Sequence, residues 1–157
     1  MKSLIATGLV LCAGIVGSLA PATSAYALPI NHAGQICHAL RDSKTANFRY
    51  DSVGIQAEAA GEVICPLVVQ KDVRGGLTVD VSVSNPNIER TSCQLVSRDF
   101  TGASLGGVKG LIKPPSQFVR LRLNGNQTAF FGYYSVICKL PFGQTLTTVT
   151  VLDLFQK

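Results

Sequence analysis

Cysteines are the residues of this chain whose number and spacing point most directly to chemistry. After an apolar N-terminal segment the chain holds four of them, Cys37, Cys65, Cys93 and Cys138. No two have the CxxC spacing of a zinc ribbon or of a thioredoxin-like redox motif. An even number of cysteines in an exported chain predicts two disulfides, for which three pairings exist. We favour Cys37–Cys65 and Cys93–Cys138, because the first would fix an irregular N-terminal segment to a strand and the second would join a middle strand to a long aromatic one.

One segment has the spacing of a catalytic motif. Residues 102–106, Gly-Ala-Ser-Leu-Gly, match the GxSxG turn that presents the nucleophilic serine of α/β-hydrolases. That motif requires a following helix, and a histidine and an acid later in the chain. Here both histidines, His32 and His38, precede Ser104, and further glycines disfavour a helix. We therefore predict no catalytic residue, and the two histidines, without a third ligand nearby, predict no metal or cofactor site.

Aromatic side chains offer a possible binding surface. On an extended strand Phe131 and Tyr133 share one face, whereas Phe130 and Tyr134 share the other. One of these faces belongs to the core. The other could stack against a sugar or a partner, but the chain contains no tryptophan, and we favour core or sheet packing.

Two polar patterns are interpreted as solvated surface. Glu58 and Glu62 are a carboxylate pair of the kind a glycoside hydrolase needs, but only by position, since the residues between them have the composition of a loop. Asn126-Gln127-Thr128 is an N-glycosylation sequon, which matters only in a host that glycosylates.

Residues 1–27 have the three zones of a cleavable secretory signal peptide. Lys2 supplies the positive end, and residues 4–19 form an apolar run that is shorter than the roughly 20 residues needed to span a bilayer. Alanines at the cleavage position and two residues before it predict a cut between Ala27 and Leu28. Export to the periplasm or out of the cell follows from this segment.

The mature chain, residues 28–157, has the length of a single domain. Loss of Lys2 leaves 13 basic against 9 acidic residues, a net charge of +4. The charges are scattered, without the basic block of a nucleic-acid groove, and no second apolar run would span a membrane after cleavage. A lipid attached to Cys12 is an alternative that Leu11, in place of a small residue, disfavours.

Alternating apolar and polar residues predict β-strands from Phe48 onward. Residues 77–84 alternate most regularly, which places their apolar side chains on one face. Asn124-Gly125 predicts a tight hairpin leading into the aromatic strand, and residues 28–47 are expected to be mostly coil with one helical turn. The expected strands cover residues 48–55, 62–70, 77–84, 91–97, 117–123, 128–140 and 145–155. We predict an all-β fold, an antiparallel β-sandwich of about seven strands stapled by two disulfides.

Residues 99–116 interrupt this pattern. Their glycines and Pro114-Pro115 predict a long loop. A loop of this length in a compact domain is either functional or mobile. Its lysines, Lys109 and Lys113, would suit the inhibition of a secreted protease.

The segments that hold the cysteines follow a characteristic order. Cys37 is followed by Val-Ile-Cys-Pro-Leu around Cys65, Ser-Cys-Gln-Leu around Cys93, and Tyr-Tyr-Ser-Val-Ile-Cys-Lys-Leu-Pro around Cys138. In this order the chain resembles a group of small secreted bacterial four-cysteine β-sandwich proteins of uncharacterised function. The likeness covers most of residues 37–141 and implies a disulfide-bonded all-β fold without implying an activity.

A second likeness lies near the C-terminus. Gly143 and Phe155 are similar to the glycine and aromatic residue that mark the last strand of chaperone–usher pilus subunits. Those subunits donate an N-terminal extension of alternating apolar residues to a neighbour, whereas residues 28–36 alternate poorly.

These observations favour an exported, non-enzymatic binding or structural module with an extracellular or envelope partner of unknown identity. A pilin-like surface assembly subunit and a secreted protease inhibitor are the alternatives.

Overall fold

The computed structural model describes residues 30–40, 47–69, 73, 75–84, 90–129 and 131–152. The expected signal peptide, its cleavage site between Ala27 and Leu28, and Cys12 lie outside these residues.

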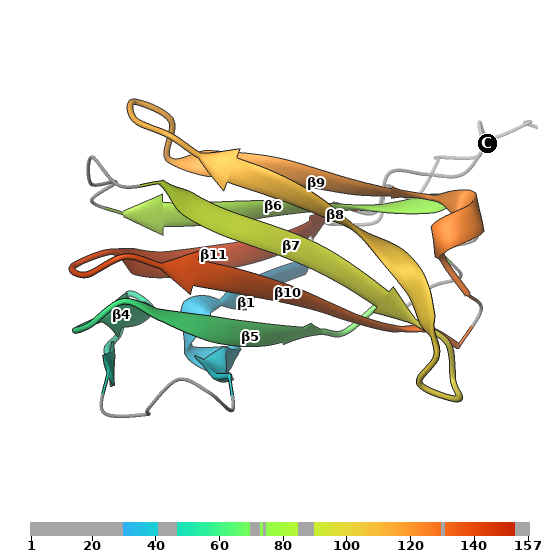
Figure 1. Cartoon of the computed structure of the whole chain (residues 1–157), viewed down its shortest axis with the longest axis horizontal. Coiled ribbons are helices and arrows are strands. Elements are labelled where there is room, and N and C mark those ends of the chain that lie inside the picture. Colours follow the sequence, from blue (N-terminus) through green and yellow to red (C-terminus); the bar gives the residue numbers. More distant parts are fainter. Residues whose placement is uncertain are drawn as a thin grey trace, which may run out of the picture.

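Two antiparallel sheets stack on each other and form a β-sandwich (Figure 1). Sheet A has six strands in the order β3-β4-β11-β6-β9, with β1 also paired to β11, and sheet B has five strands in the order β2-β5-β10-β7-β8. This architecture confirms the predicted all-β class and the antiparallel sandwich. The strands are β1 (Ile30–Ala33), β2 (His38–Ala39), β3 (Phe48–Tyr50), β4 (Ile55–Ala57), β5 (Gly61–Leu67), β6 (Gly76–Ser84), β7 (Thr91–Arg98), β8 (Ser104–Ile112), β9 (Phe118–Asn124), β10 (Tyr133–Leu140) and β11 (Thr145–Leu152).

The core lies between the sheets and follows from the alternation of the long strands. On β6 the side chains of Leu77, Val79, Val81 and Val83 are all buried, as the sequence predicts. On sheet B, Leu95 of β7 and its opposite neighbours on β10 point toward them. Because each strand buries every second side chain, the pattern of the sequence fixes which face of each sheet meets the other.

Both disulfides join the pairs of cysteines that we favoured. Cys93 on β7 and Cys138 on β10 are direct register partners, with their Cα atoms 4.1 Å apart. Cys37, just after the short helix η1 (Gly34–Ile36), is bonded to Cys65 on β5, again with 4.1 Å between the Cα atoms. Two buried disulfides fit an extracellular or otherwise oxidising compartment. The part of the chain that is described holds no helix long and apolar enough to cross a bilayer.

The predicted loop over residues 99–116 is wrong for half of its length, because residues 104–112 form β8 at the edge of sheet B. Its glycines pack closely instead of breaking the strand. A Cβ atom on Gly110 would lie 2.5 Å from the Cγ2 of Val119 on β9, and one on Gly107 would lie 2.8 Å from the carbonyl oxygen of Leu95. Glycine here permits close approach between neighbouring strands.

The predicted hairpin at Asn124-Gly125 is also wrong. Residues 125–127 form the short helix η3 (Gly125–Gln127), and the chain then leaves sheet A for sheet B. β9 pairs with β6, whereas β10 pairs with β5 and β7 and begins only at Tyr133. The Asn-Gly signal marks a local turn and carries no information about which strands pair across it.

The N-terminal segment is more ordered than the expected coil. β1 pairs with β11 along residues 148–151, β2 pairs with β5, and the one helical turn is η1. The first expected strand, residues 48–55 with a break at Ser52, is the pair β3 and β4 with a turn between them. Of these short strands, β1 and β4 pair with β11 far along the chain, which local patterns do not reveal.

Candidate binding face on sheet B

The outward side chains of sheet B form the candidate site. β10 lies in the middle of the sheet and alternates, so that Val136 and Cys138 point into the core while Ser135 and Ile137 point outward. The same alternation holds on β5, β7 and β8. We call the resulting band the outer face of sheet B. It comprises Glu62, Ile64, Pro66 and Val68; Ser92, Gln94, Val96 and Arg98; Gly107, Lys109 and Leu111; and Tyr133, Ser135, Ile137 and Lys139.

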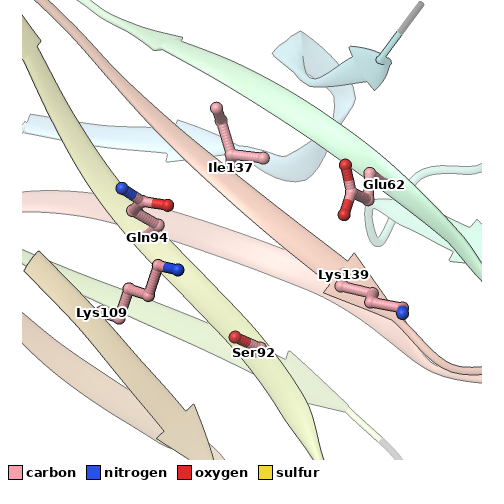
Figure 2. A pocket seen from close by; sticks show the side chains of 6 residues that line it. All are labelled: Glu62, Ser92, Gln94, Lys109, Ile137 and Lys139. Atoms are coloured by element: carbon pink, nitrogen blue, oxygen red, sulfur yellow. The ribbon is translucent and has the colours of Figure 1, made fainter. Parts of the chain in front are cut away.

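A depression of about 140 Å³ lies at one end of this face, and Figure 2 shows its side chains. In the register of the sheet, Lys139 on β10 stands between Glu62 on β5 and Ser92 on β7. The residues that line the depression come from four adjacent strands: Glu62, Ser92, Gln94, Lys109, Ile137 and Lys139.

The second row of the depression supplies an apolar floor and further polar groups. Ile137 pairs with Gln94, and Gln94 pairs with Lys109 on β8. In Figure 2 the amine of Lys109 points toward β7. Hydrogen-bond donors and acceptors therefore surround one aliphatic side chain, an arrangement that fits a ligand with both polar and apolar surface.

A smaller depression of about 70 Å³ adjoins the first, because Lys139 lines both. Its other lining residues are Ala60, Arg90, Leu140 and Pro141. Lys139 thus stands between two hollows at the end of β10.

Exposed apolar side chains gather at the opposite end of the face. Tyr133, at the start of β10, is 65% exposed and pairs with Arg98 at the end of β7. Phe131 lies two residues before Tyr133, Phe100 lies two residues after Arg98, and they are 71% and 72% exposed. Val68, one residue beyond the end of β5, is also exposed next to this row.

The turn that carries Phe100 is fixed by Asp99. The carboxylate of Asp99 accepts hydrogen bonds from the hydroxyl of Thr101 and from the backbone N–H groups of Thr101 and Ala103. These bonds lower the pKa of Asp99 from its ordinary value of 3.8, and the bond from the Thr101 hydroxyl has the largest effect. Arg98 closes the turn with a 2.9 Å bond to the carbonyl oxygen of Gly102.

No catalytic group assembles around the GxSxG segment in the part of the chain that is described. Ser104 is exposed at the start of β8, whereas His38 lies on β2, and these strands are the two opposite edges of sheet B. The described residues also contain no group of three His, Cys, Asp or Glu side chains placed to hold a metal ion.

The sequence does not predict that Lys109 and Glu62 belong to this face. Lys109 lies in a segment expected to be a loop, and Glu62 is considered only as one member of a carboxylate pair. The alternation of residues 91–97 could have placed Ser92 and Gln94 on the outer side. Tyr133 was recognised as a possible stacking residue, but core or sheet packing was favoured, and the structure exposes it.

No protein-family model matches the chain, and a comparison with curated proteins finds no match either. Among solved structures, a Podospora anserina GH26-CBM35 β-(1,4)-mannanase is similar, with a TM-score of 0.46 and 9% identity over 82% of this chain and 28% of that one. The structure of TmCBM61 in complex with β-1,4-galactotriose is similar with a TM-score of 0.40 and 8% identity, over 82% of this chain and 86% of that one. The chain therefore spans less than a third of the mannanase.

Proposed function

We propose that this protein is an exported, non-enzymatic module that binds a saccharide chain along the outer face of sheet B. The observation that carries the proposal is the pair of surfaces on β10, a hydrogen-bonding depression at Lys139 and an exposed aromatic ring at Tyr133. A saccharide presents hydroxyl groups at its edges and C–H groups on its ring faces, so it can use both surfaces at once.

The length of the face favours a chain over a single sugar. Tyr133 and Lys139 are six residue steps apart on β10, which is about 20 Å at the rise of an antiparallel strand. A ligand that contacts both ends must be extended, and its middle would lie over Val96, Ser135 and Pro66, which form one row across three strands.

The strands below the face are covalently fixed. The Cys93–Cys138 bridge ties β7 to β10, and the Cys37–Cys65 bridge ties β5 to the N-terminal segment. A rigid platform loses little conformational entropy when a ligand binds, which improves affinity without any further contact.

The two alternative functions have less support. Half of the long loop on which protease inhibition depended is strand β8, including Lys109. The N-terminal segment that a pilin-like subunit would donate to a neighbour includes residues 30–33, which pair here with β11 of the same chain.

The test is to measure binding of the exported chain, purified from a periplasmic or culture fraction, to a panel of soluble polysaccharides. Tyr133→Ala should weaken binding about tenfold, because an aromatic contact and its buried area together contribute roughly 1.4 kcal/mol. Phe118→Ala is the matched control, since Phe118 is 53% exposed on the outer side of β9 in sheet A. The proposal fails if the unmodified protein binds no polysaccharide, or if the two variants lose affinity equally.

A further inference from the structure

The polar end of the outer face carries an excess of positive charge. Together, the residues that line the two adjoining depressions include three cations, Arg90, Lys109 and Lys139, and one carboxylate, Glu62. Lys139 lines both hollows, so its positive charge is shared between them. A neutral saccharide has no group that would use this charge, whereas an acidic one does.

We infer that the site selects acidic saccharide chains, with a carboxylate or sulfate group held at Lys139 and a second one near Lys109. This inference rests on the proposed function, which it narrows to one class of ligand. Lys139 and Lys109 lie on strands separated by two strand spacings, about 9.5 Å across the sheet. Two anionic groups of one chain can therefore each meet a lysine without folding back.

The type of cation predicts how the anion is recognised. Lysine acts as a point charge with rotatable donors and lacks the planar fork with which arginine fits a carboxylate. The amide of Gln94 and the hydroxyl of Ser92 add neutral donors beside the two lysines. The site should accordingly accept either carboxylate or sulfate, and should lose affinity as salt screens exposed charges.

The sheet A side offers a contrast in the use of charge. Arg120 on β9 makes two hydrogen bonds to Asp80 on β6, from Nε to Oδ1 at 2.8 Å and from Nη2 to Oδ2 at 2.7 Å. That arginine is matched by its own carboxylate, while the hollows of sheet B hold more cations than carboxylates.

The experiment measures the affinity of the exported chain for polygalacturonate, chondroitin sulfate and neutral dextran at low and high sodium chloride. Both acidic polymers should bind more tightly than dextran, and the difference should shrink at high salt. Lys139→Met should weaken acidic binding about two- to fivefold, the value of one exposed ion pair, and should weaken dextran binding less, because dextran has no anionic group to pair with the amine.

Arg122→Met is the matched control, because it removes one positive charge from an exposed position on the outer side of β9 in sheet A. Equal losses in the two variants would show attraction by net charge alone and would overturn the inference. Equal, salt-independent affinity for all three polymers would overturn it too, while leaving the proposed function standing.

Single-stranded DNA serves as a further probe in the same assay. Binding as tight as that of the acidic polysaccharides would reveal a general polyanion site and overturn the saccharide class. Failure of every polysaccharide to bind would instead remove the proposed function itself.

Discussion

The outer faces of the two sheets differ in composition although the same rule of alternation builds both. On sheet A the outward residues of the paired strands β11, β6 and β9, apart from Phe118 and Leu152, are hydroxyl-bearing or charged: Thr78, Asp80, Ser82, Arg120, Arg122, Thr148 and Thr150. On sheet B the centre of the face instead holds Ile64, Pro66, Val96 and Ile137, and Tyr133 stands at one end. An antiparallel sheet needs polar residues on its water side, and sheet A meets that need. The apolar residues on the outer side of sheet B are not required by the fold, which supports the contact surface proposed for that face.

The two outer faces also differ in how their charged side chains are paired. The bidentate hydrogen bond with Asp80 raises the pKa of Arg120, so this arginine has its carboxylate partner within the chain. The hollows of sheet B hold three cations against one carboxylate. The comparison shows a charge on sheet A that is paired within the chain, and hollows on sheet B whose lining holds more cations than carboxylates, which supports the binding face proposed above.

The largest expected effect comes from removing the bridge beneath the candidate face. The double substitution Cys93→Ala and Cys138→Ala should lower the free energy of unfolding by about 4 kcal/mol on the chain-entropy estimate for a bridge of sequence separation 45. Thermal unfolding should show a Tm lower by about 10–15 °C, and saccharide binding should weaken because β7 and β10 are no longer tied. An unchanged Tm would contradict the role given to this bridge.

A smaller effect is expected where β8 approaches β9. Gly110→Ala places a Cβ atom 2.5 Å from the Cγ2 of Val119, so β8 must shift, which should destabilise the fold by about 1–3 kcal/mol. Because Lys109 moves with β8, affinity for acidic polymers should fall as well. Gly75→Ala is the control, since nothing lies within 4 Å of its added Cβ atom. Similar denaturation curves for the two variants would exclude this packing.

The surface of sheet A should be less sensitive. Arg120→Leu removes an ion pair whose arginine side chain is 57% exposed, so it should shift the midpoint of urea denaturation only slightly. Saccharide binding should remain unchanged, since the pair lies on the opposite outer face. Loss of binding in this variant would remove the functional distinction between the faces.

The smallest expected effect is local and depends on pH. The pKa of Asp99 is lowered in the folded protein, so its hydrogen bonds support the turn above pH 3.8 and are lost as the pH falls through the lowered pKa. The amide resonances of Thr101 and Ala103 should then shift together in an NMR titration, before the rest of sheet B changes. Asp99→Asn should abolish this transition, and a titration at or above the ordinary value would contradict the hydrogen-bonded turn.

The regular strands were predictable because they depend on local alternation of apolar and polar residues. The cysteine pairing was predictable because four cysteines allow only three pairings. The valines of β6 alternate without interruption, and Pro66 has the edge position that its missing N–H requires, beyond the end of the two-residue strand β2. Strand β8 was not predicted, because glycine indicates a break in secondary structure when its neighbours in space are unknown. The packing of Gly110 against Val119 becomes visible only once β9 is placed beside β8.

The candidate site was harder to predict for a related reason. Glu62, Lys139 and Ser92 lie in one row because β10 pairs with both β5 and β7. The paired residues are far apart along the chain. Only the register of three strands brings them together. Local propensity carries no information on this register, although the alternation within β7 alone could have indicated that Ser92 and Gln94 point outward.

The position of the Cys37–Cys65 bridge also has a mechanical consequence. A force that pulls on the N-terminal segment first loads β1, whose residues pair with β11 of sheet A. Beyond β1 the load reaches Cys37, and the disulfide passes it through a covalent bond to β5 of sheet B, the strand next to β10. The N-terminal segment is therefore anchored to both sheets, by backbone hydrogen bonds in one and by a covalent bond in the other.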